Sequence, residues 1–104
     1  MRQLLPPMGA CFATDRIMVD GQHVGYMYRE HPDRDGDSGW RFFAGDESQE
    51  YIDDLSHTGL YAVNTVANYD PDIIPHISTS PPCAFEKIPG TTEYRAIGPP
   101  EDLE

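Results

Sequence analysis

Three aspartates stand at alternate positions, Asp33, Asp35 and Asp37, among glycines and ahead of the chain's single tryptophan. This spacing begins a calcium-binding EF-hand loop, which needs oxygen ligands at positions 1, 3 and 5, a glycine at 6 and a glutamate at 12. Counted from Asp33, position 6 is Ser38 and position 12 is Ala44. We therefore favour a solvated acidic connection between two strands, in which Asp and Gly supply the turn geometry. The alternative is a small accessory domain that binds a metal or ligand through this loop.

Other patterns typical of catalysis or metal binding do not occur in the sequence. The four histidines are scattered, and neither cysteine lies in a C-x-x-C motif. Ser38 is not surrounded by the G-x-S-x-G motif of a nucleophile elbow, and there is no phosphate-binding glycine motif. We therefore expect no catalytic residues, no metal site and no cofactor, and we predict that the protein is not an enzyme. An enzyme would require a pocket with polar groups of perturbed pKa.

The charge of the chain points to a class of partner. Its 104 residues suit one compact domain, and 18 acidic against 7 basic residues give a net charge of -11. Without a basic patch to neutralise phosphates, we expect no binding to nucleic acid or to a membrane surface. Such a surface would attract a basic protein partner by electrostatic steering. The simpler interpretation is that the acids keep the surface solvated.

The two cysteines, Cys11 and Cys83, are expected to be reduced and buried thiols. Residues 1–10 contain no apolar run long enough for a signal peptide or a membrane span. We therefore expect a cytoplasmic protein.

The first half of the chain is rich in strand signals. Residues 11–19 and 23–30 read as two strands, and Asp20–Gly21 between them is typical of a hairpin turn. Residues 40–45 are short and aromatic and follow the acidic loop as a third strand. Because consecutive segments usually pair, we predict a three-stranded antiparallel meander.

Next comes a segment that suits a short helix, at 46–55. Asp46 is the expected N-cap, and Gln49 stands three residues later, as in a capping box. Residues 59–66 fit either a strand or a helix, since periodicity alone does not decide. Pro71 and Pro75 are expected to prevent a regular element at 70–77.

The end of the chain predicts a second hairpin, with strands at 84–88 and 93–97. The fold class is therefore α+β, with an antiparallel sheet of about four to six strands and one or two short helices. We expect a single domain at 11–97, a loose lead-in at 1–10 and a frayed tail at 98–104.

Segments 36–47 and 64–75 each combine aromatic residues with closely spaced acids. Aromatic anchors with an acidic rim fit a protein-binding surface for a basic partner. For the rings, a core position is the favoured alternative. For the acids, partner contact is the hypothesis, and the candidate contact residues are Asp33, Asp35, Asp37, Asp46, Glu47, Asp70 and Asp72.

The segments "VGYMYRE" (24–30), "DSGWRFFAGDE" (37–47) and "NTVANYDPDIIP" (64–75) resemble the immunity-protein-33-like domain family, and the resemblance extends from Cys11 to Ile97. It implies an immunity protein of a bacterial polymorphic toxin system, which binds a cognate toxin and blocks it stoichiometrically. The expected partner is a protein, with a basic toxin domain as the candidate. The family has no established catalytic residues, so the resemblance implies no active site.

Overall fold

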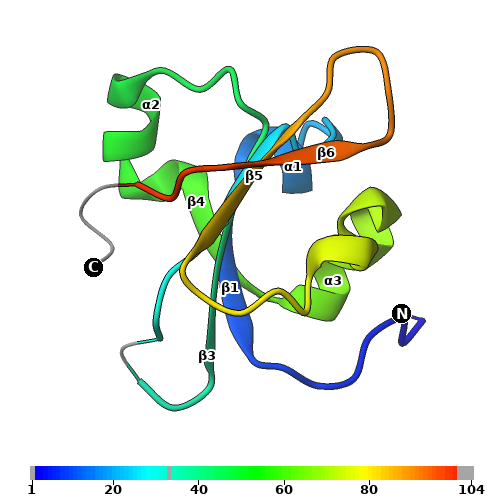
Figure 1. Cartoon of the computed structure of the whole chain (residues 1–104). Helices are drawn as coiled ribbons and strands as arrows, with labels where there is room; N and C mark the ends of the chain where they lie inside the picture. The colour runs from blue at the N-terminus through cyan, green and yellow to red at the C-terminus, as the bar shows by residue number, and fades with distance from the viewer. Residues whose placement is uncertain (1, 33, 101–104) are drawn as a thin grey trace.

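The computed structural model describes residues 2–32 and 34–100. In this part of the chain, six strands form one sheet in the order β4-β1-β3-β2-β5-β6 (Figure 1). The strands are β1 (Ala10–Thr14), β2 (Tyr26–Arg29), β3 (Asp37–Phe43), β4 (Thr58–Ala62), β5 (Cys83–Lys87) and β6 (Tyr94–Ile97). The helices are α1 (Asp15–Met18), α2 (Gln49–Asp53) and α3 (Val63–Tyr69), with 3-10 helices η1 (Leu55–His57) and η2 (Pro71–His76). The predicted α+β class is confirmed.

The sheet is mixed, which differs from the antiparallel sheet expected. Strands β1 and β3 run parallel, and the other neighbouring strands are antiparallel. Because β3 lies between β1 and β2, the predicted meander and its first hairpin are wrong. Several short helices are also present where one or two were expected.

The first hairpin does not form because the chain leaves β1 in a helical turn. Helix α1 follows Thr14 directly and buries Ile17 completely. Gly21 has a φ of 78° and donates its N–H to the carbonyl of Ile17. The Asp20–Gly21 pair therefore ends a helix, a role in which a positive-φ glycine is common, and it is not a hairpin turn.

Helix α2 begins later than predicted. Its N-cap is Ser48, whose Oγ accepts the N–H of Tyr51 at 3.1 Å, so the prediction of Asp46 as the cap is wrong. Glu47 holds the preceding turn in place, because its carboxylate accepts the N–H groups of Ala44 and Gly45.

The ambiguous segment at 59–66 contains both elements, since β4 ends at Ala62 and α3 begins at Val63. Contrary to expectation, η2 forms across the two prolines. Pro71 lies in its first turn, where no backbone N–H is required. The second hairpin is confirmed as the antiparallel pair β5 and β6.

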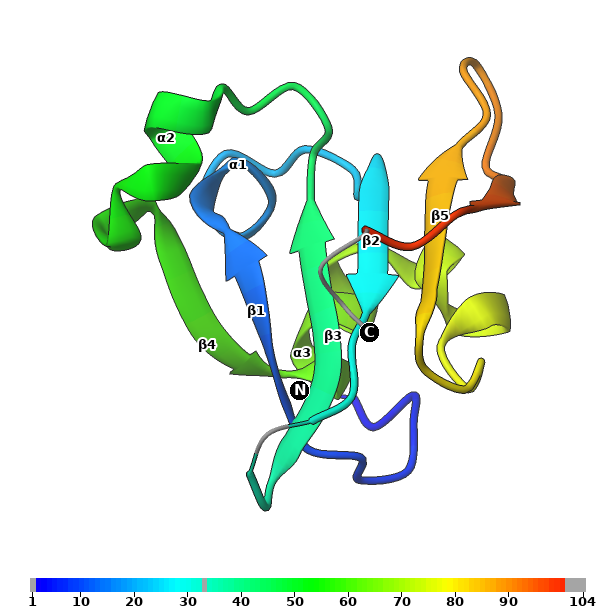
Figure 2. The same cartoon turned by 60° about the vertical axis from the view of Figure 1, so that its left-hand side comes forward.

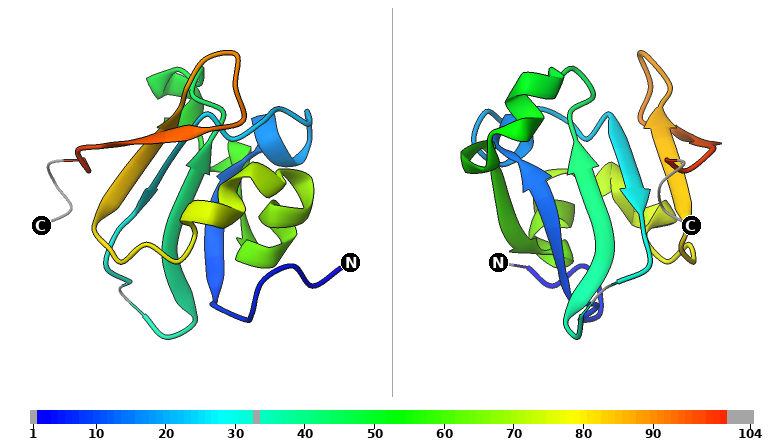
Figure 3. Two further views of the ribbon diagram at one scale, coloured as in Figure 1. Left: turned by 45° about the vertical axis from the view of Figure 1, so that its right-hand side comes forward. Right: turned by 90° about the vertical axis from the view of Figure 1, so that its left-hand side faces the viewer.

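The sheet is covered mainly on one face. Helices α1 and α3 and the helix η2 lie on that side, as Figure 2 and both panels of Figure 3 show. Trp40, Phe42 and Met27 point into this layer and are fully buried, together with Val66 and Ile73. Since side chains alternate along a strand, the residues between them point to the opposite face.

The segment before β1 lies against the domain. The N–H groups of Leu4 and Leu5 donate to Asn64 Oδ1 at 2.7 and 3.1 Å, and Leu5 is buried. The division into a lead-in, a domain at 11–97 and a tail at 98–104 stays a prediction, and residues 101–104 lie outside the described part.

Candidate partner-binding face

The sheet face opposite the core carries a strip of exposed apolar side chains. Phe12 on β1 and Leu60 on β4 are register partners and are 42% and 66% exposed. Leu55 in η1 is 83% exposed. Three large apolar side chains in solvent on one side of a small sheet are typical of a surface that contacts another molecule.

We call this surface the open face and define it by Phe12, Tyr28, Arg41, Phe43 and Leu60. The strand register places these residues on one side, because Phe12 and Tyr28 are both partners of Arg41. The rings of Tyr28 and Phe43 stack with centroids 5.9 Å apart. The right panel of Figure 3 looks onto the strands, with α3 behind them.

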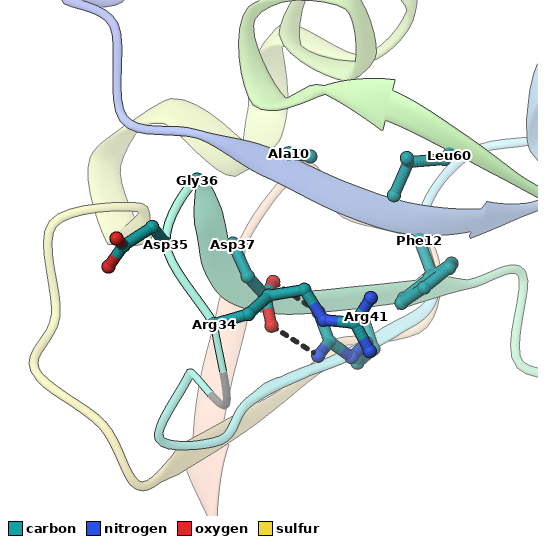
Figure 4. A pocket seen from close by; sticks show the side chains of 8 residues that line it. All are labelled: Ala10, Phe12, Arg34, Asp35, Gly36, Asp37, Arg41 and Leu60. Atoms are coloured by element: carbon teal, nitrogen blue, oxygen red, sulfur yellow. Dashed lines mark hydrogen bonds and ion pairs between the residues drawn. The ribbon is translucent and has the colours of Figure 1, made fainter.

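Two hollows shape the open face. The larger, of about 500 Å³, lies between the sheet and the α2–η1 segment and includes Phe12, Phe43, Ile52 and Leu55 in its lining. The smaller, of about 280 Å³, lies at the start of β3 and is lined by apolar side chains, including Leu60, together with charged ones (Figure 4). The aromatic and aliphatic walls of the larger hollow, with few charged groups, suit an inserted side chain of a partner.

Arg41 is the central charge of the open face, but two carboxylates hold it. Its Nη1 and Nη2 each lie 3.0 Å from an oxygen of Asp37, and its Nε donates to Glu30 at 2.9 Å. The guanidinium also lies over the Phe12 ring, 4.8 Å from its centroid. The hydrogen bonds from Arg41 hold the pKa of Asp37 below its ordinary value. The group therefore carries a net negative charge.

The structure separates the predicted contact acids into three places. Asp35 and Asp37 lie together at the smaller hollow, where Asp35 is exposed and points outward from the turn (Figure 4). Asp46 lies near α2 with its side chain 57% exposed and is 3.6 Å from Arg16. Asp33 lies outside the described residues.

Glu47 has a structural position beside β1. Its Oε2 accepts the Thr14 hydroxyl and the Ala44 N–H, both at 2.7 Å, and its Oε1 accepts the Gly45 N–H at 2.8 Å. Partial burial raises the pKa of Glu47, but these hydrogen bonds outweigh it and leave the pKa below its ordinary value.

Asp70 and Asp72 lie on the helical side, away from the open face. Asp70 is 1% exposed and accepts the N–H groups of Val24 and Asp72 at 2.8 and 3.1 Å. Asp72 pairs with Lys87 at 3.0 Å. No result tests the role of the seven acids in partner contact, which stays a prediction.

His23, Asp70 and Asp72 also bring three possible metal-ligand atoms within 4.8 Å of one another. However, each oxygen of Asp70 already accepts a backbone N–H, and the Lys87 ammonium is bonded to Asp72. A cation would have to displace that ammonium, so we assign this cluster a structural role. At the Asp33–Asp37 loop, both oxygens of Asp37 are held by Arg41.

Sequence reasoning did not identify the exposed positions of Phe12 and Leu60 on the open face. It placed Phe12 in a strand, but it could not show that, among the described residues, only the α2–η1 segment lies over this side of the sheet. Arg41 alternates with the buried Trp40 and Phe42, so the alternation of side chains along the strand correctly predicts that it lies on the opposite side of the sheet. The cysteines are free: Cys11 is buried and Cys83 partly exposed. Burial raises the pKa of Cys11 to about 12, which makes it unreactive.

Comparison with known families decides the affiliation of the chain. The family model described as "Immunity protein Imm33 domain" matches residues 11–97. The chain belongs to the Imm33 family. This confirms the resemblance carried by the three sequence segments. No match was found among curated proteins or among solved structures. Among the described residues of this Imm33 domain, no helix is long and apolar enough to span a membrane.

Proposed function

We propose that this Imm33 protein is a non-catalytic immunity protein that neutralises a cognate bacterial toxin by stoichiometric binding in the cytoplasm of the producing cell. The observation that supports the proposal is the open face, where Phe12, Leu55 and Leu60 are exposed beside acidic groups. A binding protein with an exposed, partly apolar sheet face is suited to covering a surface of its partner.

The charge of the chain supports a basic partner. Its net charge is -11, Asp35 is exposed at the smaller hollow, and the side chain of Asp46 is 57% exposed. Asp35 and Asp46 are our proposed contact acids among the described residues. Asp37, Glu47, Asp70 and Asp72 make internal hydrogen bonds or ion pairs, so we propose a structural role for them. Electrostatic attraction of this kind raises the association rate and weakens with salt, since exposed charges are screened beyond about 8 Å at physiological ionic strength.

The test takes its candidate toxin domain from the genes that neighbour the gene for this chain. We expect a 1:1 complex by calorimetry, inhibition of the toxin at one equivalent, and an association rate that falls roughly tenfold or more between low and high salt. Asp35→Asn should slow association further, whereas Asp20→Asn, at the exposed end of α1, is the matched control. Failure of the toxin domain to bind at low salt would overturn the proposal.

A further inference from the structure

Strand β4 forms one edge of the sheet, as Figure 2 shows. In an antiparallel ladder, residues alternate between pairs that exchange hydrogen bonds and pairs whose backbone groups point away from each other. The N–H of Val63 donates to the carbonyl of Gly9, so the Gly9–Val63 pair is a hydrogen-bonded pair of the ladder. The register then makes Cys11–Tyr61 a bonded pair and Phe12–Leu60 a non-bonded pair.

A second contact supports the same assignment. The N–H of Ala10 donates to the carbonyl of Gly36 at 2.6 Å, and its carbonyl accepts the Ser38 hydroxyl. The backbone N–H and carbonyl of Ala10 therefore point toward β3 and away from β4. The backbone N–H and carbonyl of Ala62, its register partner on β4, must consequently point away from β1.

The outer edge of β4 thus presents a defined set of backbone groups. The Thr58 N–H is used within η1, where it donates to the carbonyl of Leu55. The groups directed outward are the Thr58 carbonyl, both groups of Leu60 and the Ala62 N–H. This order of acceptors and donors is the one that a short additional strand requires.

The edge also lacks the two residue types that most often protect an exposed strand, charged residues and proline: neither occurs between Thr58 and Ala62. At the opposite edge, Arg95 of β6 forms an ion pair with Glu86. A hollow of about 390 Å³ lies along β4, with Pro7, Met8 and Leu60 in its lining.

We propose that β4 is a strand-addition site, which pairs with an extended, basic segment of the partner protein. An apolar side chain of that segment would lie beside Leu60 on the open face, and the exposed Asp35, which borders the smaller hollow together with Leu60, would attract its basic side chains. Charge favours this occupant over a second copy of the chain, because each copy carries a charge of -11. The inference rests on the proposed function, in which the partner is a toxin.

The first experiment uses a synthetic peptide, acetyl-Lys-Thr-Val-Thr-Lys-amide, which as a strand places its valine and both lysines on one face, with the ¹⁵N-labelled full chain. We expect chemical-shift changes and slowed amide exchange at Leu60 and Ala62, the two residues with outward N–H groups. The matched peptides are acetyl-Glu-Thr-Val-Thr-Glu-amide, which keeps the strand pattern with opposite charge, and an N-methylated copy of the basic peptide. Each should bind at least about fivefold more weakly. Equal binding of all three, or no effect at β4 at millimolar peptide, would overturn the inference.

The second experiment uses variants. Leu60→Pro removes the outward N–H at an edge position that tolerates proline, and Leu60→Lys keeps the N–H but repels a basic strand. Val19→Lys is the matched control, because Val19 is 71% exposed and lies outside the strands. Both Leu60 variants should lose peptide and toxin affinity at least about fivefold, and the control should lose neither. If Leu60→Pro does not fold, Leu60→Lys alone decides.

The two proposals can fail separately. Toxin neutralisation that survives both Leu60 variants would overturn strand addition and leave the immunity function intact. Specific peptide binding without any toxin complex would overturn the immunity function. A stable homodimer that Leu60→Lys dissolves, measured by light scattering, would identify a second copy as the occupant and overturn the inference.

Discussion

Arg41 donates to both carboxylate oxygens of Asp37, four residues earlier on the same strand, at 3.0 Å each. In a regular strand, Cα atoms four residues apart are separated by about 13 Å, which is long for a direct hydrogen bond between their side chains. The register shows how the gap closes: Ala10 pairs with Asp37 and Phe12 with Arg41, so two steps on β1 match four on β3. A bulge at Gly39, whose φ is 86°, takes up the extra length.

The Asp37–Arg41 pair makes the free energy of unfolding depend on pH in the acid range. Because the hydrogen bonds from Arg41 lower the pKa of Asp37, the stabilisation is present above the ordinary aspartate pKa of about 3.9 and is lost as pH falls through the lowered pKa. Asp37→Asn should reduce the free energy of unfolding at pH 7 by about 1–3 kcal/mol. Urea unfolding should show this deficit shrinking below about pH 4.

Asp35→Asn is the control for that series, since Asp35 is exposed and lies in the same turn. Its stability should match the parent protein within about 0.5 kcal/mol at both pH values. A deficit in Asp37→Asn that stays constant from pH 7 to pH 3 would contradict the assignment.

Glu47 should matter for folding more than an ordinary surface glutamate. Its side chain holds the Thr14 hydroxyl and the N–H groups of Ala44 and Gly45. Glu47→Ala should therefore lower the free energy of unfolding by about 1–3 kcal/mol. Glu93→Ala, at an exposed position before β6, should change it by less than about 0.5 kcal/mol. Equal midpoints in chemical denaturation would refute the structural role.

Substitutions of Asp70 and of Asp35 should have different effects: the first should lower stability, and the second should weaken partner binding. Asp70 is 1% exposed and accepts the Val24 N–H, so Asp70→Ala leaves a buried donor without its partner and should cost about 2–3 kcal/mol of stability. Asp35→Ala should leave stability unchanged and slow association with a basic partner. Thermal unfolding and stopped-flow association measure the two effects. Slow association in a fully stable Asp70→Ala would contradict this division.

Local signals in the sequence predicted the α+β class and the β5–β6 hairpin, because a short connection and alternating side chains determine a hairpin. They could not predict the parallel pairing of β1 with β3, which depends on contacts between distant segments. The Asp20–Gly21 pair illustrates the limit. The same two residues favour a hairpin turn or the end of a helix, and the burial of Ile17 selects the helix.

Local sequence signals have the same limit at the candidate site. The sequence identified the acids, but some of their partners come from distant parts of the chain: Thr14 for Glu47 and Val24 for Asp70. Which carboxylates remain exposed is thus a property of tertiary structure. Leu60 was included in the ambiguous segment, and its exposure follows from the edge position of β4, which no local pattern encodes.

Gly39 should be the least replaceable glycine near the open face. It has a φ of 86°, and an added Cβ would overlap the carbonyl oxygen of Glu30. Gly36, in the turn before β3, has a φ of 85° but open space around it, so Gly36→Ala measures the cost of the backbone conformation alone. Gly36→Ala should cost about 1–2 kcal/mol from positive φ alone.

Gly39→Ala should cost more than Gly36→Ala, because β2 and β3 must also move apart at Glu30. That movement would disturb Arg41, which bonds both Glu30 and Asp37. Chemical denaturation measures the two costs, and amide exchange of β3 reports the separation. Equal destabilisation by both substitutions would show that the close approach at Glu30 does not limit position 39, and that the bulge does not need glycine to bring Asp37 to Arg41.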